Sequence, residues 1–390
     1  MLHHLDNYSF VKEIGKGAFG VVFEAKHKIS GKSVAVKVIT KFNPKDPFHL
    51  SRARKELSIM RSIHHIFACE LLEVLENEDF IYIIMEFVEG ENFRDYVNQR
   101  GKIPELQAKK FFTEIALVMK HLHCDIMVAH RDLKAENILI DKEGRIRIID
   151  FGLSKALDAV DEILKTACGS IAYAPPEMVR GESYTLGADI WSLGILLYAM
   201  VAGRLPYEDE NMGTLIKKIM YLTPNYPELF TKDLKDLLNG ILMKDPKQRF
   251  DINKILSHPW LDPNRLTLSE NLLKPIGFDE DILETCESMG LSSYQIKQNI
   301  ESQDLVTYRI LLKGKNLSII NREIHTKENE RRNSFSFSLP ARQSMLPVPN
   351  QMGIETSSKR KNSSFLDSLR VPIRRKSVNS NNLHTFKDPL

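Results

Sequence analysis

The sequence predicts an α+β fold in which a small β-rich unit comes first and a larger helical unit follows. Short β-type runs occupy most of residues 8–87. Helical spacing of apolar residues dominates between residues 92 and 260. With 390 residues, 43% of them hydrophobic and 27% charged, the chain has room for one large unit or two lobes, and for something smaller besides.

The β-rich unit contains five β-type runs, at residues 8–14, 21–28, 33–40, 71–75 and 80–85. One helix interrupts them after Pro47, because the apolar residues Leu50, Ala53, Leu57 and Met60 recur on one helical face. We therefore expect a small antiparallel sheet with one helix.

The helical unit is predicted to contain helices near residues 104–123, 188–202, 212–220 and 232–243, with β-type runs only around residues 130–152. A short acidic, helical region follows as far as about Gly314. Residues 321–390 carry 13 Lys and Arg against 6 Asp and Glu, so the formal net charge of +3 arises from this segment. Its Ser- and Asn-rich composition provides too little apolar surface for a core, which predicts a disordered basic tail.

Composition also excludes several classes of protein. No apolar stretch is long enough to span a membrane, and the N-terminus does not resemble a secretory signal. The four cysteines are far apart and form no C-x-x-C pair, so we expect free thiols. We expect an intracellular protein in the cytoplasm, with the nucleus left open as a second location. Nucleic acid is not an expected partner, but weak contact of the tail with acidic lipid stays open.

A glycine-rich motif, Gly15-x-Gly17-x-x-Gly20-x-Val22, comes near the start of the chain. Since Gly20 leads directly into a β-type run and not into a helix, the motif predicts the turn of a hairpin, unlike the glycine loop of a dinucleotide-binding fold. Without side chains, backbone amides can approach phosphate oxygens closely. Taken alone, the motif is equally compatible with a hairpin that binds nothing.

Lys37 is a lone cation in the apolar run of residues 34–37. It predicts a contact with the α- and β-phosphates of a nucleotide, provided that a carboxylate holds it in place. Glu56, in the predicted helix, is the candidate for that carboxylate. A surface lysine and a solvated glutamate remain the alternatives for these two residues alone.

The strongest motif spans residues 130–137, which read HRDLKAEN between β-type runs. Asp132 is expected to accept or orient the proton of a substrate hydroxyl, and Lys134 to neutralise a phosphoryl group in transfer. Asn137 is a candidate metal ligand. Asp150, in the D-F-G triplet of residues 150–152, is expected to bridge Mg²⁺ to the β- and γ-phosphates.

In this order, the motifs resemble those of the eukaryotic protein kinase family over residues 8–260. The resemblance implies a two-lobed kinase domain at residues 8–261, with an N-lobe at 8–87, a C-lobe at 88–261, and ATP with Mg²⁺ in the cleft. It implies that Met60, Leu71, His130 and Phe151 form an apolar spine. The implied ATP-binding residues, besides Lys37, Asn137 and Asp150, are Ile14, Gly15, Gly17, Gly20, Val22, Ala35, Met85, Glu86, Val88 and Glu91.

Lys134 and Asn137 resemble the pattern of the serine/threonine class. Residues 130–139, 166–170 and 257–260 resemble the calmodulin-dependent and AMP-activated kinase group, and most of all its AMP-activated and Snf-related branch. Thr166 matches a threonine that an upstream kinase phosphorylates in many family members. Phosphate there is expected to pair with Arg131 and order the activation segment. Ser170 resembles the hydroxyl that contacts the catalytic Asp and Lys. The usual A-P-E element appears as residues 175–177, PPE, and its Glu177 is expected to pair with Arg249.

The resemblance places Glu91 and Glu136 where basic residues of protein substrates bind. We therefore expect selection for Arg three residues before the acceptor. Three tail serines that follow Arg at this spacing, Ser334, Ser363 and Ser377, become candidate autophosphorylation sites.

Residues 278–313 resemble a small helical module of the ubiquitin-associated (UBA) type, with a helical extension packed on the large lobe as the alternative. A module of this size is expected to dock on the kinase domain.

Two other functions are alternatives to an active protein kinase. A catalytically inactive scaffold is disfavoured because Lys37, Asp132, Asn137 and Asp150 are all present. A small-molecule kinase would not need the activation segment.

Overall fold

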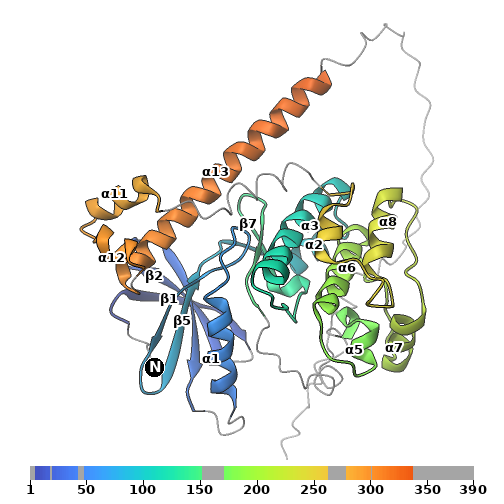
Figure 1. Cartoon of the computed structure of the whole chain (residues 1–390), viewed down its shortest axis with the longest axis horizontal. Helices are drawn as coiled ribbons and strands as arrows, with labels where there is room; N and C mark the ends of the chain where they lie inside the picture. The colour runs from blue at the N-terminus through green and yellow to red at the C-terminus, as the bar shows by residue number, and fades with distance from the viewer. Residues whose placement is uncertain are drawn as a thin grey trace, which may run out of the picture.

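The computed structural model describes residues 5–17, 20–42, 48–151, 171–261, 278–299 and 301–336, and shows two lobes with three further helices (Figure 1). The N-lobe is an antiparallel sheet of five strands in the order β1-β2-β3-β5-β4. The strands are β1 (Tyr8–Gly17), β2 (Gly20–His27), β3 (Ser33–Thr40), β4 (Leu71–Glu76) and β5 (Phe80–Glu86).

Helix α1 (His49–Met60) packs on this sheet with the apolar face that the sequence predicted. Ala53, Leu57 and Met60 are buried in one core with Ile81 and Ile83 of the sheet. The expected antiparallel sheet with one helix is therefore confirmed.

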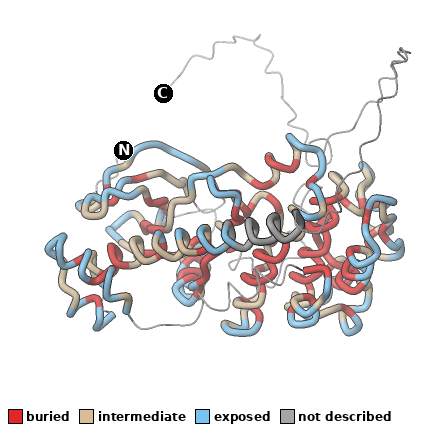
Figure 2. The backbone as a smooth tube through the Cα atoms, turned by 90° about the horizontal axis from the view of Figure 1, so that it is seen from above, coloured by how far each residue is buried: buried red, intermediate tan, exposed pale blue. Residues whose placement is uncertain are grey.

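The C-lobe is mainly helical, and many of its residues are buried (Figure 2). Its helix α6 (Leu186–Ala202) is buried throughout residues 188–201. Side chains cap four helices by accepting a backbone N–H bond, namely those of Asn92, Asn211, Thr231 and Asp251. The other helices are α2 (Phe93–Arg100), α3 (Glu105–Lys120), α5 (Pro176–Val179), α7 (Met212–Tyr221), α8 (Lys232–Ile241) and α9 (Ile252–Leu256). A π-helical turn at His121–Asp125 and 3₁₀ turns at Ala135–Asn137 and Ile171–Tyr173 complete the helical part.

A small sheet joins the two lobes. Strands β6 (Gly90–Asn92), β7 (Ile138–Asp141) and β8 (Ile146–Ile148) form it in that order. Its strand β8 also pairs with the N-lobe, because Cys69 N donates to Ile148 O at 2.8 Å and Ile148 N to Phe67 O at 2.9 Å. The segment between α1 and β4 is thereby fixed to the C-lobe.

Three helices follow the C-lobe, namely α11 (Glu280–Ser288), α12 (Ser293–Lys297) and α13 (Gln303–Ser336). They share a core of their own, formed by Ile282, Leu283, Cys286, Ile296, Leu305 and Tyr308. Asp279 and Ser292 cap the first two helices, and Gly290 has φ +83°, as a Met-Gly turn requires. The second helix is short and ends at Lys297.

The third helix is much longer than the sequence predicted. It continues to Ser336, far into the segment expected to be a disordered tail. Ile320 is buried in the main kinase core and Leu317 packs against it, so contacts with the C-lobe support the added turns. The expectation of disorder from residue 321 was wrong for residues 321–336, and residues 337–390 lie outside the described part of the chain.

In the described ranges no helix combines the length and the apolar character needed to cross a bilayer. Cys69, Cys124 and Cys286 are free thiols, as expected, and Cys168 lies outside the described residues.

Candidate functional site

The glycine-rich motif forms a hairpin between β1 and β2, as its sequence predicted. Gly15 is opposite Val22 and Gly17 is opposite Gly20, while residues 18 and 19 of the turn lie outside the described residues. A Cβ on Gly20 would be 1.9 Å from Val38 O, so this glycine is required by the close approach of β3. Near Gly15 a Cβ would meet no described atom within 4 Å.

Lys37 and Glu56 come together from β3 and α1. The Lys37 Nζ and Glu56 Oε1 atoms are 3.8 Å apart, and both side chains are largely buried. Ala35 and Met85 are directly opposite each other in the sheet, and Val22 is opposite Lys37. The residues expected around a nucleotide thus lie on adjacent strands.

Two of the expected ATP-binding residues, Glu86 and Val88, lie at the end of β5 and just after it. The Glu86 amide donates to Glu70 O at 3.0 Å, and the Cys69 thiol donates to Glu86 O at 3.0 Å. Val88 is half-buried, and Ile14 on the hairpin is exposed. The bond from the Cys69 thiol to this carbonyl was not foreseen, because nothing in the sequence places residues 69 and 86 side by side.

Three side chains of the HRDLKAEN segment form one polar cluster. Lys134 Nζ is 2.8 Å from Asp132 Oδ2. Asn137 Nδ2 donates to Asp132 O at 2.8 Å and to Asp132 Oδ2 at 3.0 Å. The carboxylate is therefore oriented by a cation and an amide, as a group that positions a substrate hydroxyl must be.

The buried carboxylate of Asp189 holds the backbone of this segment. It accepts from His130 N at 2.7 Å, from Arg131 N at 2.9 Å and from Tyr184 OH at 2.5 Å, and it lies 2.8 Å from His123 Nε2. Burial raises the pKa of Asp189, but the hydrogen bonds and charges of His123, His130 and Tyr184 together outweigh it and lower this pKa. These bonds stabilise Arg131 at φ +67°, which few residues other than glycine adopt.

The structure supports the fit of Mg²⁺ to Asn137 and Asp150. Both described hydrogen bonds of the Asn137 amide use its nitrogen, so its oxygen points elsewhere. Asp150 is exposed, and its charge, like that of Asp132, opposes the fall in the pKa of His130 that burial causes. Among the described residues no group of three or more His, Cys, Asp or Glu side chains is placed to hold a metal ion. Mg²⁺ needs few protein ligands when phosphates supply the remaining oxygens.

The four residues of the expected spine, Met60, Leu71, His130 and Phe151, are all buried. The rings of His130 and Phe151 are 5.5 Å apart, and burial lowers the pKa of His130. The PPE element is also fixed in the core, because Arg249 binds both oxygens of Glu177 at 2.6 and 2.9 Å, as the sequence predicted.

The two carboxylates expected to bind substrate lie near arginines of the same chain. Glu91 Oε1 is 3.7 Å from Arg100 Nη1, and Glu136 Oε1 is 3.9 Å from Arg94 Nη1. Sequence analysis missed these arginines, although their place in the first and last turns of α2, right after Glu91, was a usable signal. Asn92 Nδ2 also donates to Glu136 O at 2.9 Å and ties α2 to the catalytic segment.

Several expected regulatory and substrate positions lie outside the described residues. These are Gly152, Thr166 and Ser170, which lie in or next to the activation segment, and the tail residues Ser363 and Ser377.

A family comparison agrees with this geometry. The model of the protein kinase domain matches residues 8–261. The chain belongs to the protein kinase family. Its kinase domain thus includes both lobes and every site residue described above.

Curated relatives indicate which branch of the family this chain is similar to. The SNF1-related protein kinase catalytic subunit alpha KIN12 of Arabidopsis thaliana is 34% identical over 80% of this chain and 65% of its own length. The maternal embryonic leucine zipper kinase of Xenopus tropicalis is 38% identical over 66% of this chain and 39% of its own. The carbon catabolite-derepressing protein kinase of Candida tropicalis is 36% identical over 77% of this chain and 49% of its own length. The kinase chain thus spans between 39% and 65% of these relatives' lengths.

Proposed function

We propose that this chain is a serine/threonine protein kinase that transfers the γ-phosphoryl group of ATP to hydroxyls of other proteins. The cluster of Asp132, Lys134 and Asn137 carries the proposal, because it presents an oriented carboxylate and a cation side by side. Lys37, paired with Glu56, would bind the α- and β-phosphates. Asn137 and Asp150 would hold Mg²⁺, which neutralises charge on the phosphates.

A phosphoryl-transfer assay with ATP and a generic Ser/Thr peptide tests this activity. Asp132→Asn and Lys37→Met are expected to lose it while melting like the wild-type protein, because catalysis here depends on positioning and charge. Wild-type turnover by the Asp132→Asn variant would refute the mechanism. Inactivity of the wild-type protein toward every peptide would favour the scaffold, and activity on metabolites alone would favour a small-molecule kinase.

Activation by an upstream kinase that phosphorylates Thr166 is part of the proposal. Its support is Arg131, which Asp189 holds in a fixed conformation next to the catalytic Asp132. A phosphate on the activation segment would gain charge-assisted hydrogen bonds there. We expect Thr166→Ala to be poorly active. Full activity of protein shown by mass spectrometry to be unphosphorylated would contradict this control.

We further propose that substrates carry Arg three residues before the acceptor, with Glu91 and Glu136 as its partners and Ser170 near the catalytic pair. The two glutamates remain partly exposed, at 42% and 28% of their side chains, which supports this role. A peptide series that changes this Arg to Ala, repeated with Glu91→Ala, measures the preference. Ser334, Ser363 and Ser377 are then candidate autophosphorylation sites.

For residues 278–313 we propose regulation within the chain by docking on the kinase domain, in preference to capture of ubiquitin. Val306 of α13 is buried in the same core as Val36 and Ile84 of the N-lobe sheet. Gln303 donates to Glu73 at 2.8 Å and lies 2.9 Å from His27 Nε2. The module therefore covers strands of the N-lobe.

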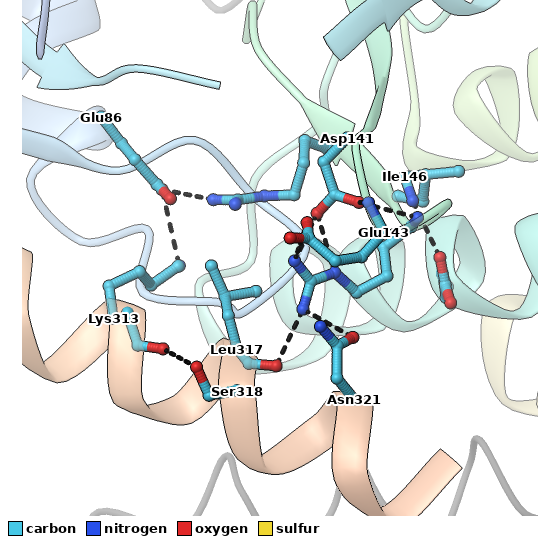
Figure 3. Close-up of polar contacts among 12 residues, drawn as sticks. Glu86, Asp141, Glu143, Ile146, Lys313, Leu317, Ser318 and Asn321 are labelled. Atoms are coloured by element: carbon cyan, nitrogen blue, oxygen red, sulfur yellow. Dashed lines mark hydrogen bonds and ion pairs between the residues drawn. The ribbon is translucent and has the colours of Figure 1, made fainter. Parts of the chain in front are cut away.

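Helix α13 then runs past the end of β5, where Lys313 faces Glu86 (Figure 3). Lys313 is buried and donates to His65 O at 2.7 Å, to Ala68 O at 3.3 Å and to Glu70 Oε1 at 2.5 Å. Burial raises the pKa of Glu70, but the charges and hydrogen bonds of Lys313 and His64 together outweigh it and lower this pKa to about 2. Because Glu70 O accepts from Glu86 N, the contact of Lys313 with Glu70 also supports the end of β5, where ATP is expected to bind.

The same helix also reaches the C-lobe. Arg145, next to β8, donates to Leu317 O at 2.8 Å and to Asn321 Oδ1 at 3.0 Å, and its Nε donates to Asp141 at 2.7 Å (Figure 3). One helix thus contacts both lobes. Deletion of residues 278–336 is expected to change the KM for ATP or the melting temperature. Unchanged kinetics and melting, together with measurable ubiquitin binding, would reverse the assignment.

A further inference from the structure

Helix α2 supplies two arginines to the acidic surface where substrate is proposed to bind. Arg94 lies in its first turn, 3.9 Å from Glu136, and Arg100 in its last turn, 3.7 Å from Glu91. Three carboxylates are present there, on Glu91, Asp95 and Glu136. With the two arginines, these five side chains have a net charge of −1, where the carboxylates alone would carry −3.

Both arginines are held by their own helix. The Nε and Nη2 atoms of Arg94 donate to Asp95 Oδ1 at 3.3 and 3.4 Å. The guanidinium of Arg100 lies 3.6 Å from the ring centre of Tyr96 and donates to Tyr96 O at 3.4 Å. Such stacking on an aromatic face fixes the position of a guanidinium.

The arginines neutralise the glutamates without occupying their hydrogen-bonding oxygens. Distances of 3.7 and 3.9 Å are too long for hydrogen bonds but short enough for attraction between charges. In the part of the chain that the structure describes, Glu136 Oε2 is buried and accepts no hydrogen bond. A buried carboxylate oxygen in this state favours an incoming donor.

We propose that Arg94 and Arg100 are specificity-determining residues that weaken the selection for arginine in the substrate. This inference rests on the proposed function, in which Glu91 and Glu136 bind that arginine. An incoming guanidinium would meet Glu136 Oε2, which accepts no hydrogen bond from a described residue, but also a resident guanidinium of like charge. The subsite therefore accepts hydrogen-bond donors broadly and discriminates by charge only modestly.

The test compares two peptides that differ only by Arg or Ala three residues before the acceptor. The kcat/KM ratio of the pair is measured for the wild-type kinase, Arg94→Ala, Arg94→Gln and Arg100→Ala. Arg180→Ala is the matched control, because Arg180 is an exposed arginine whose bond to Glu182 at 2.6 Å lies away from α2. Since exposed ion pairs contribute little, we expect the ratio to rise about two- to fivefold in each α2 variant and to stay unchanged in the control.

The change should appear in KM and not in kcat, and it should shrink in high salt, as an effect between exposed charges does. A merely structural role would instead lower kcat for both peptides equally. An unchanged or lower ratio in all three α2 variants, while the wild-type kinase still prefers the Arg peptide, would overturn the inference and leave the proposed function standing. If no form phosphorylates either peptide, the proposed function fails, and this inference fails with it.

Discussion

Replacement of Lys313 by Met tests how strongly α13 is held on the kinase domain. The Lys313 side chain is only 10% exposed, and its ammonium group donates to two backbone carbonyls and to Glu70. Met fills much of the same space but carries no donor. The substitution therefore leaves a largely buried carboxylate without its main cation.

The pKa of Glu70 gives the expected magnitude. Its fall from 4.5 to about 2 corresponds to ~3 kcal/mol of stabilisation, at 1.36 kcal/mol for each pKa unit. Because 19% of the side chain is still exposed, solvent screening reduces this to about 2 kcal/mol. Because Lys313 shares this effect with His64, we expect the free energy of unfolding of Lys313→Met to be lower by up to that amount at pH 7.

The sign of the pH dependence follows from the direction of the shift. A carboxylate whose pKa is lower in the folded state stabilises fully above its unfolded pKa, and this contribution is lost as the pH falls through the folded pKa. The difference in the free energy of unfolding between the wild-type protein and Lys313→Met should therefore reach its full size above pH 4.5 and disappear toward pH 2.

Urea denaturation at several pH values measures these differences. Lys315→Met is the matched control, because Lys315 lies two residues away on the same helix and pairs with the module residues Asp279 and Asp281 at the surface. It should unfold almost like the wild-type protein. Equal unfolding curves for Lys313→Met and Lys315→Met at pH 7 would refute the idea that the buried ion pair holds α13 in place.

Other predictions concern the kinase domain itself. Gly20→Ala should lower the melting temperature, because its Cβ would be 1.9 Å from Val38 O. Glu177→Gln should destabilise the C-lobe by about 3–5 kcal/mol in denaturant titrations, since it leaves the buried Arg249 without its bidentate partner. Asp189→Asn should reduce kcat more than the KM for ATP, because an amide oxygen holds the catalytic backbone less well than a carboxylate; equal loss in both constants would contradict this role.

Sequence alone was sufficient where the determinants are local. The glycine hairpin follows from three glycines next to a β-type run, and the faces of α1 follow from apolar spacing. Residues 130–137 hold Asp132, Lys134 and Asn137 within one short segment, so their contacts could be expected from the motif.

The sequence did not predict features that depend on contacts between segments far apart in the chain. Residues 321–336 are polar and carry little apolar surface, yet α13 continues through them, because Leu317 and Ile320 find a C-lobe surface and Arg145 binds Asn321. The pairing of Arg94 with Glu136 likewise depends on how α2 packs beside the catalytic segment. Composition and the spacing of apolar residues describe one segment at a time, so they cannot predict such contacts.

The length of α13 between its two contacts also has a consequence for motion. Val306 is buried with the N-lobe sheet and Ile320 with the C-lobe, a span of about 21 Å along a helix. A single inserted residue would rotate one contact by about 100° relative to the other, so this segment has a fixed register that a flexible linker would lack. Gly314 lies between the contacts, and a Cβ there would meet no described atom within 4 Å. Since glycine weakens a helix by about 1 kcal/mol, this turn is intrinsically weaker than its neighbours, and its order depends on the adjacent ion pair of Lys313 with Glu70.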